Sequence, residues 1–505
     1  MARQVHKNIV WSYLSLAAGT LSPLILIPLF TRLLGHELYG EYVVITSISY
    51  YIGLANLGIG QTVANRIAEA VAKRDDEQVA TLVSTAFYSL AAVVGPLIIV
   101  LFVATPWLWP LLVGSPDRSA KFAFLVIFGL GLISFPFKAQ SMMLRGYQRI
   151  DREQGIWVLL NLLRIAGIAA VLLSGLKLAA VATVYGVVVL LGGIASYLLA
   201  AQISPAAHPV PGRFSWRLLR GMVVPSVAFL MLQISSTLAT RIDNVVIGYV
   251  LGATAVTSYS VPYRLLLMVI LLFSILQSAL QPTITAHYAR DNRPLLRQAY
   301  SFLMRLAMFY AVAAAVALWL VGPLFIRLWA GHGIYPGGLV FGLQIIFAAV
   351  QIMMAPAEMI LWSTSRHHTW AVIALVEGVL NLGLSIWWAH PWGLAGVIGA
   401  SIVARAVTSA WYIPIAASTI VGMSMRHALR RMAPGVALAA VTLAAMWLIW
   451  TVAAPSSPGV AIGFAAALMI AFTAAFGWLV FTAEERRVAI DWILPAFSSQ
   501  GVAQG

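Results

Sequence analysis

The 505-residue chain is 61% hydrophobic and only 9% charged, and its mean hydropathy is +0.91. A soluble globular protein could not cover so much apolar surface, so the composition indicates a protein that uses lipid as its solvent. The absence of cysteine excludes disulfide bonds and thiol catalysis, and the net charge of +15 comes from basic residues in short segments between apolar runs. This placement indicates membrane topology and argues against a nucleic-acid partner.

Fourteen apolar segments of about 20 to 27 residues follow one another along the chain, and each can cross the roughly 30 Å hydrocarbon core of a bilayer as an α-helix. They are expected at 9–31, 42–63, 79–104, 121–143, 155–175, 178–200, 221–248, 256–282, 300–326, 338–362, 370–389, 394–418, 434–453 and 459–481. The first lacks an Ala-x-Ala cleavage pattern, so we expect it to be retained. The chain is therefore predicted to be an all-α polytopic membrane protein with about 14 transmembrane helices.

Lysine and arginine are distributed unevenly between the two sides of this arrangement. The amino terminus, alternate connecting segments and the tail hold 20 of the 31 basic residues, whereas the opposite segments hold five. Because basic residues gather in cytoplasmic loops, both termini are predicted to lie in the cytoplasm.

An internal repeat with an offset of about 217 residues relates two halves of the chain. Leu34, Gly35, Tyr42, Met142, Leu144 and Arg149 recur as Leu251, Gly252, Tyr259, Met359, Leu361 and Arg366. Six spans separate the copies, so both have the same orientation, and such parallel repeats are typical of transporters with a substrate site between the halves. We expect an N-terminal lobe at 1–205, a C-terminal lobe at 206–422, two further helices with a cytoplasmic tail at 423–505, and alternating access.

Basic side chains inside the predicted spans are candidates for substrate binding, because each costs roughly 2.5 to 3.5 kcal/mol at the centre of a membrane helix. Lys138 and Arg305 lie near cytoplasmic helix ends, where long side chains reach the interface, and are set aside. Guanidinium groups hold phosphate oxygens in bidentate fashion, so an anionic headgroup is expected to be bound by Arg164, Arg264, Arg405, Arg241 and Asn161. Each arginine can instead neutralise a carboxylate within the helix bundle.

Acidic side chains inside the spans are candidates for ion coupling, because a carboxylate in a low-dielectric setting favours a proton or a cation. The candidates are Asp243, Glu377, Asn381 and Glu358, with Glu377 and Asn381 one helical turn apart on the same face. Asp243 and Arg264 lie at a similar depth and can meet as an ion pair. A role in packing alone is an equally open interpretation of these acids.

Signatures of enzymes and metal sites are missing from the sequence. The nine histidines form no His-Glu-x-x-His pattern, and no glycine-rich phosphate loop precedes a Lys-Ser or Lys-Thr pair. We therefore predict a secondary transporter and not an enzyme, with no cofactor and no metal. A channel or purely structural bundle is the alternative, and the intramembrane charges argue against it.

Several segments near the amino terminus resemble the polysaccharide transport family of Wzx-type flippases, in the multidrug/oligosaccharidyl-lipid/polysaccharide (MOP) exporter superfamily. They are Asn8-Ile-Val-Trp-Ser-Tyr13, Pro28-Leu-Phe-Thr-Arg-Leu-Leu-Gly-His-Glu-Leu-Tyr-Gly-Glu-Tyr42, Asn56-Leu-Gly-Ile-Gly60 and Asn65-Arg-Ile-Ala68. The resemblance implies a V-shaped pair of lobes around a central cavity, in the bacterial inner membrane. It also implies a polyprenyl-pyrophosphate-linked oligosaccharide moved from the cytoplasmic to the periplasmic leaflet, driven by a proton or sodium gradient, with polymerase and chain-length partners of the polysaccharide pathway.

Two relatives in the same superfamily stay as alternatives. Fourteen spans are also typical of lipid II flippases, whose last two helices flank a groove for the lipid tail, and whose sodium ligands on spans seven and eleven correspond by helix position to Asp243, Glu377 and Asn381. A cation-coupled multidrug exporter would bind cations, which the excess of intramembrane arginine disfavours.

Overall fold

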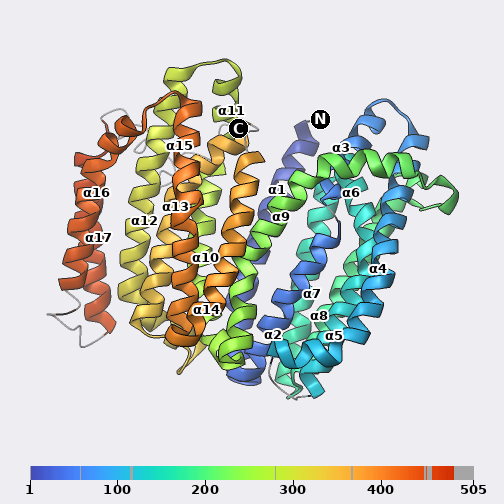
Figure 1. Cartoon of the computed structure of the whole chain (residues 1–505), viewed down its shortest axis with the longest axis horizontal. Coiled ribbons are helices and arrows are strands. Elements are labelled where there is room, and N and C mark those ends of the chain that lie inside the picture. Colours follow the sequence, from blue (N-terminus) through green and yellow to red (C-terminus); the bar gives the residue numbers. More distant parts are fainter. Residues whose placement is uncertain are drawn as a thin grey trace. The chain divides into compact units, whose positions relative to one another are not determined.

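The computed structural model describes residues 2–56, 58–113, 118–278, 280–364, 368–448, 451 and 458–482. The predicted cytoplasmic tail from residue 483 onward lies outside the described residues. Over the described ranges all regular structure is helical, which confirms the predicted all-α class (Figure 1). Two compact units are present: unit 1 comprises 1–261, 329–334 and 371–404, and unit 2 comprises 262–328, 335–370 and 405–505. The units cross the boundaries of the lobes expected from the repeat, and those lobes stay a prediction.

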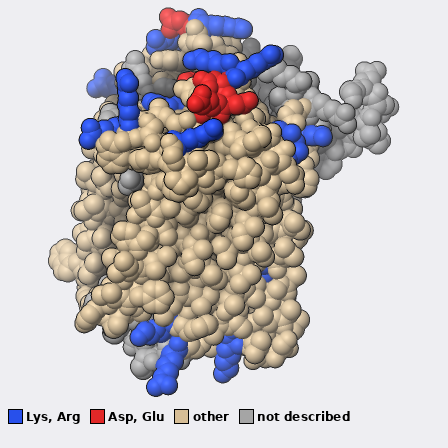
Figure 2. Space-filling model, turned by 90° about the vertical axis from the view of Figure 1, so that its right-hand side faces the viewer, with Lys and Arg blue, Asp and Glu red and all other residues tan. Residues whose placement is uncertain are grey.

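The described residues contain 10 helices long and apolar enough to cross a membrane, or up to 11 if the bent pair His36–Leu54 and Ile59–Ala72 is one span. One of the ten, Thr369–Val421, contains two of the fourteen segments predicted from hydropathy, because a kinked helix joins them. On the face drawn in Figure 2, Lys and Arg gather at the two ends, and the broad band between them is almost free of charge. The band is the pattern expected of a surface in contact with lipid.

Unit 1 is built on the N-terminal helices. They are α1 (Ala2–Leu29), the π-helical turn η1 (Phe30–Leu34), α2 (His36–Ser49), η2 (Tyr50–Asn56), α3 (Ile59–Ala72), α4 (Asp76–Val113), α5 (Arg118–Ser134), η3 (Phe135–Phe137), α6 (Lys138–Gly146), α7 (Ile150–Leu173), α8 (Leu178–Ala201), η4 (Pro205–Ala207), η5 (Pro211–Arg213) and α9 (Trp216–Leu251). The first part of α10 (Ala253–Ser278) and most of α14 (His368–Val407) complete it. Helix α7 packs between α1 and α8, and α8 also packs on α5 (Figure 1).

A proline near the end of α1 creates a contact with a distant part of the chain. Pro28 has no N–H, so the carbonyl of Leu24, four residues earlier, loses its helical partner. The indole N–H of Trp329 donates to that carbonyl at 2.9 Å. The hydroxyl of Thr31 donates to the carbonyl of Ala330 at 2.7 Å. The short segment 329–334 is therefore held against α1, which explains why it belongs to unit 1.

Gly40 in α2 allows a close approach of two backbones. A Cβ at this position would overlap the carbonyl group of Ala253 at the start of α10. The hydroxyl of Thr257, one turn further along α10, donates to the carbonyl of His36 at 2.6 Å. The Tyr-Gly-Glu-Tyr part of the N-terminal motif therefore has a packing role, because only glycine fits between these helices.

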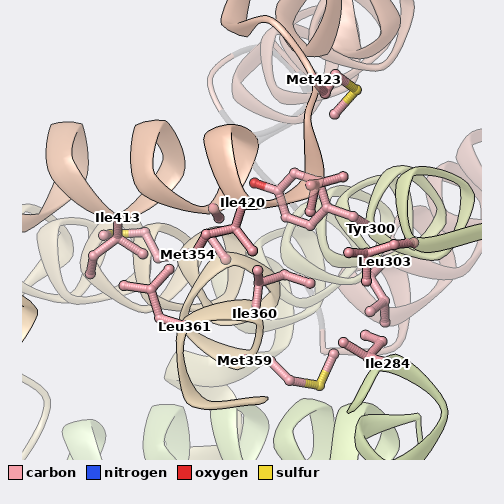
Figure 3. Packing of buried hydrophobic residues seen from close by; sticks show 14 residues of the cluster. Ile284, Tyr300, Leu303, Met354, Met359, Ile360, Leu361, Ile413, Ile420 and Met423 are labelled. Carbon is pink, nitrogen blue, oxygen red and sulfur yellow. The ribbon is translucent and has the colours of Figure 1, made fainter. Parts of the chain in front are cut away.

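Unit 2 packs the remaining helices around an apolar core. They are the rest of α10, α11 (Gln281–Ala289), α12 (Arg293–Ala330), α13 (Gly338–Ser363), α15 (Ser409–Val421), α16 (Met425–Leu448) and α17 (Pro458–Leu479). In Figure 3 the side chains of Tyr300, Ile360 and Ile420, from three different helices, converge in this core. A second cluster joins α12 to α17, where Phe309 stacks on Phe472 with ring centroids 5.5 Å apart. Helix α17 is thus attached to α12 by aromatic packing, and α16 packs against α17.

Candidate functional site

The nine residues predicted to bind substrate or ions divide between the two units. Six of them lie in unit 1, namely Asn161, Arg164, Arg241, Asp243, Glu377 and Asn381. Three lie in unit 2, namely Arg264, Glu358 and Arg405. Two groups of contacts form in unit 1, one around Asp243 and one around Arg164 and Arg241.

The Asp243 cluster brings three helices of unit 1 together. Asn381 on α14 donates through its amide nitrogen to Oδ1 of Asp243 at 3.2 Å. The hydroxyl of Tyr259 on α10 donates to Oδ2 at 2.8 Å, and that of Ser401 on α14 lies 3.2 Å from the same atom. Ser385 completes the cluster, with its hydroxyl 3.1 Å from Oδ1 of Asn381. Asp243 and Asn381, chosen separately from the sequence, are thus in direct contact.

A break in α14 brings its two arms together at this cluster. Gly393 has φ 55° and ψ −136°, so the helix bends there and its second arm returns toward the first. Gly396 makes the close approach possible, because a Cβ there would overlap the carbonyl of Trp388. The hydroxyl of Ser401 then lies 3.1 Å from Oδ1 of Asn381, twenty residues earlier in the chain. The break therefore determines which polar side chains of α14 face Asp243.

The cluster combines one carboxylate with neutral oxygen and amide groups. All the hydrogen bonds that the described residues make to Asp243 come from uncharged side chains, those of Tyr259, Asn381 and Ser401. The single proton of the Ser401 hydroxyl has three acceptors within 3.4 Å, and it can serve only some of them. Acceptor oxygens are therefore in excess, and a proton or a hard cation bound there would relieve both the excess and the negative charge.

Glu377 is buried on α14, one turn before Asn381 and on the same face. Its proximity to Asn381 in the chain agrees with the expected pair, while its role in ion coupling stays a prediction. Among the described residues, no group of three or more His, Asp or Glu side chains is arranged to hold a metal ion.

Arg164 on α7 is positioned by polar contacts and an aromatic contact. Its Nη2 donates to Oδ1 of Asn161, one turn earlier, and to the hydroxyl of Ser22 on α1 at 3.3 Å. The guanidinium also lies 5.9 Å from the ring centroid of Tyr185 on α8. Asn161 and Arg164, predicted to share a helix face, therefore act as one hydrogen-bonded unit.

Arg241 on α9 lies against Tyr50 at the start of η2. Its guanidinium carbon is 3.8 Å from the ring centroid of Tyr50, a close cation–π contact. The hydroxyl of Tyr185 interacts electrostatically with both Arg164 and Arg241, and that of Tyr51 with both Arg241 and Asp243. The hydroxyl groups of Tyr51 and Tyr185 are thus each within electrostatic range of two of these charged side chains. We call Arg164, Arg241, Tyr50, Tyr51 and Tyr185 the arginine–tyrosine group.

Two buried polar atoms of this group have no hydrogen-bond partner among the described residues. They are Nε of Arg164 and the hydroxyl oxygen of Tyr51. A buried donor without a partner is costly, roughly 1–3 kcal/mol, and needs an explanation. A ligand with acceptor oxygens would provide the missing partners.

The three predicted residues of unit 2 have a different environment. Arg405 on α14 lies 3.7 Å from Glu358 on α13 and 6.0 Å from the ring centroid of Phe347. This ion pair matches the alternative interpretation of Arg405, in which the arginine neutralises a carboxylate within the helix bundle. Arg264 lies in the part of α10 that belongs to unit 2, and its predicted pairing with Asp243 stays a prediction.

A large apolar groove of about 770 Å³ lies in unit 2 between α12, α13, α15 and α16. Its lining is mostly aliphatic and aromatic, as at Trp319, Met353, Trp411 and Met446. Arg305, set aside in the sequence, lines the groove and is 7% exposed. The groove thus combines an apolar wall with a buried guanidinium.

Residues 5–287, more than half of the chain, match a family described as polysaccharide biosynthesis protein. The chain belongs to this family. A segment of 193 residues is 24% identical to the uncharacterized membrane protein EpsK of Bacillus subtilis (strain 168), and it covers 38% of this chain and 38% of EpsK. Membership in the polysaccharide biosynthesis protein family confirms the resemblance predicted from the N-terminal motifs.

Solved structures of MOP transporters have a similar fold. An inward closed conformation of the lipid II flippase MurJ gives a TM-score of 0.69 at 12% identity, over 93% of this chain and 98% of that one. An inward-facing multidrug resistance MATE family transporter of the MOP superfamily gives 0.65 at 16% identity, over 82% and 99%. At such identities the likeness concerns the fold alone, and the fold is that of a multi-pass membrane protein.

The sequence analysis did not predict the hydroxyl side chains of the Asp243 cluster and of the arginine–tyrosine group. Tyr259, Ser385 and Ser401 complete the Asp243 cluster, and Tyr50, Tyr51 and Tyr185 complete the arginine–tyrosine group. The repeat offered one signal for a functional tyrosine, because Tyr259 is the counterpart of Tyr42. The ring centroid of Tyr42 lies 6.3 Å from that of Tyr185. Serine has no comparable signal, since hydroxyl side chains are frequent throughout the spans.

Proposed function

We propose that the chain is a flippase that moves a polyprenyl-pyrophosphate-linked oligosaccharide from the cytoplasmic to the periplasmic leaflet of the bacterial inner membrane. It does so by ion-coupled alternating access and is not an enzyme. The observation that carries the proposal is the pair of unsatisfied polar atoms, Nε of Arg164 and the hydroxyl of Tyr51, together with the guanidinium of Arg241 on the neighbouring Tyr50 ring. The family description, polysaccharide biosynthesis protein, supports the substrate class. The distribution of lysine and arginine supports cytoplasmic termini.

The arginine–tyrosine group has the chemistry that a pyrophosphate-linked sugar requires. Arg164 and Arg241 supply fixed positive charge and planar donors for phosphate oxygens. The tyrosine rings supply flat apolar faces for sugar rings, and their hydroxyls supply hydrogen bonds. Asn161 holds the Arg164 guanidinium in place through its Oδ1. In unit 2, Arg405 would bind substrate by exchanging Glu358 for a phosphate, and Arg264 is proposed to contribute further positive charge.

The Asp243 cluster is proposed as the site of ion coupling. A proton or sodium ion at the carboxylate would compensate a charge that the described neighbours meet only with neutral groups. Loading would strengthen the contact between α9, α10 and the two arms of α14, and release would weaken it. Glu377, one turn from Asn381, is proposed to tune the cluster, and Glu358 to act through Arg405.

The apolar groove of unit 2 is proposed to hold the polyprenyl tail. A chain of isoprene units needs a continuous apolar wall, which the groove supplies between α12, α13, α15 and α16. The guanidinium of Arg305, which lines the groove, is proposed to bind a phosphate oxygen of the lipid. Polymerase and chain-length proteins of the polysaccharide pathway are the proposed partners.

A lipid II flippase is the second candidate function. It is favoured by the MurJ fold, which covers 93% of this chain. Multidrug export is less suitable, because the guanidinium groups of Arg164 and Arg241 would repel a cationic drug.

Leaflet transfer of defined lipids in proteoliposomes tests the proposal. A fluorescent polyprenyl-pyrophosphate oligosaccharide and a fluorescent lipid II are compared under an imposed proton or sodium gradient. The proposal predicts faster transfer of the oligosaccharide. Faster transfer of lipid II would favour the second candidate, and transfer of neither lipid would overturn both.

A further inference from the structure

A second pocket, lined by polar side chains, lies at the end of unit 1 that carries the amino terminus. Its volume is about 480 Å³, within the range of small-molecule sites, and α3, α6 and the start of α7 form its walls. The amino-terminal helix is attached nearby, because Asn8 donates to the carbonyl of Gln148 at 3.0 Å and Gln4 to Asp151 at 2.7 Å. With the orientation proposed above, this pocket opens on the cytoplasmic side.

Arg145 lines this pocket, and its guanidinium is bonded to Glu153 through Nε, while its Nη groups make no hydrogen bond to the described residues. Its Nε donates to both carboxylate oxygens of Glu153, at 2.9 and 2.8 Å. The side chain of Glu153 is 4% exposed, whereas that of Arg145 is 52% exposed. The described residues offer the two terminal Nη groups no hydrogen bond, so both can serve as donors toward the pocket. A guanidinium fixed in this way presents the planar fork that matches a phosphate.

Amide side chains line most of the remaining polar wall. They come from Gln61, Asn65, Gln148 and Gln154, and Gln61 donates to Asn65 at 2.9 Å. An amide offers both a donor and an acceptor, which is the combination that sugar hydroxyl groups need. One guanidinium beside four amides therefore suits a sugar joined to a phosphate better than either group alone.

The second copy of the repeat shows that the fold does not require these polar residues. At an offset of 217 residues, Trp362 stands where Arg145 stands, and Trp370 where Glu153 stands. These two tryptophans also contact each other, edge to face, with ring centroids 5.7 Å apart. The counterparts of Gln61, Asn65 and Gln154 are Ser278, Pro282 and Ala371. At the equivalent positions of the repeat, unit 2 thus has an apolar pair where unit 1 has an ion pair, so the repeat itself does not require a charge there.

We propose that this pocket binds the sugar–phosphate headgroup of the lipid-linked substrate at the cytoplasmic face, before the headgroup reaches the arginine–tyrosine group. The proposal rests on the flippase function proposed above for the substrate class. Arg145 binds a phosphate oxygen, the amides bind the adjoining sugar, and Glu153 positions Arg145.

Equilibrium binding to the full-length protein in detergent tests the pocket directly. The probe is a fluorescent farnesyl-pyrophosphate-linked N-acetylglucosamine, displaced by N-acetylglucosamine 1-phosphate, inorganic phosphate or phosphatidylglycerol. The double variant Arg145→Leu/Glu153→Leu removes both charges together, so that no buried carboxylate is left without a partner. Gln154→Leu removes one amide, and Gln78→Leu, an exposed amide on α4, is the matched control.

If the pocket binds the headgroup, the Kd for the probe should rise at least about fivefold in the double variant. The rise should be smaller in Gln154→Leu, and Gln78→Leu should show none. N-acetylglucosamine 1-phosphate should displace the probe better than inorganic phosphate or phosphatidylglycerol. An unchanged Kd in the folded double variant would overturn the proposal. Displacement by phosphatidylglycerol as effective as that by N-acetylglucosamine 1-phosphate would overturn it too. A wild-type protein that binds the probe in this way but moves no lipid would leave the pocket in place and contradict the flippase function.

Discussion

Asn381 donates a hydrogen bond to Asp243 across 3.2 Å, and this contact joins α9 to α14 in unit 1. The partner atoms of Asp243 are otherwise hydroxyl groups, from Tyr259 and Ser401. Because the described neighbours supply no formal positive charge to the carboxylate through a hydrogen bond, the charge is available for a mobile ion.

Asp243→Asn should abolish the dependence of transfer on the ion gradient and lower gradient-driven transfer at least about tenfold. The amide keeps the shape but not the charge, and its nitrogen donates where Oδ2 of Asp243 accepts, so the hydroxyl groups of Tyr259 and Ser401 must turn to accept. The protein should still fold, with a Tm equal to or above that of the wild type. Transfer in proteoliposomes and thermal unfolding measure the two effects. Asp75→Asn, in an exposed loop, is the control. Full gradient dependence in Asp243→Asn would remove the cluster from the coupling mechanism.

Ser401→Ala should weaken ion dependence more than Ser385→Ala. Ser401 contacts both Asp243 and Asn381, whereas Ser385 contacts only Asn381 within this cluster. The ion concentration for half-maximal transfer should rise several-fold in Ser401→Ala and about twofold or less in Ser385→Ala. Ser401→Thr retains the hydroxyl and should restore most of the affinity. Equal effects of the two alanine variants would contradict the assigned geometry.

Trp329→Phe should destabilise the protein by about 1–2 kcal/mol, because the carbonyl of Leu24 would lose its donor above Pro28. Thermal unfolding in detergent measures the change. Trp387→Phe is the matched control, since Trp387 is 68% exposed. A Tm for Trp329→Phe equal to that of the control would show that the contact contributes nothing.

Gly40→Ala should prevent normal folding or lower the Tm strongly, because the added methyl group would overlap the backbone of Ala253. Gly19→Ala in α1 is the matched control, since its added Cβ has no neighbour within 4 Å. A helix gains about 0.5–1 kcal/mol from alanine over glycine, so Gly19→Ala should be neutral or stabilising. Monodispersity and Tm separate the two variants, and an unaffected Gly40→Ala would show that α2 and α10 are not in close contact.

The sequence predicted the fold class, the family and two partners of one cluster. Apolar segment length alone requires membrane helices, because the backbone must satisfy its own hydrogen bonds in lipid. Asp243 and Asn381 stood out because ionisable and amide groups are rare in such helices. Ser401 and Tyr259 did not stand out, because their contacts with Asp243 depend on the bend at Gly393 and on the position of α10. No local sequence pattern encodes either feature.

The motif that indicated the family has a structural role in this protein. Pro28, Thr31 and Gly40 hold the segment 329–334 and the start of α10 against the amino-terminal helices. Hydropathy also separated 370–389 from 394–418, and the non-helical residue Gly393 lies between them on the kinked segment Thr369–Val421. A window of apolar residues detects length but not the direction in which a helix continues after a glycine.

The most direct test of the account is leaflet transfer of a fluorescent polyprenyl-pyrophosphate oligosaccharide by wild type, Arg164→Ala and Arg241→Ala in proteoliposomes under an imposed ion gradient. Arg220→Ala, an exposed arginine near the start of α9, is the control. The account predicts that both test variants fold but transfer the lipid at least about tenfold more slowly, while the control matches the wild type. Wild-type rates in folded Arg164→Ala and Arg241→Ala would contradict the claim that these arginines bind the headgroup.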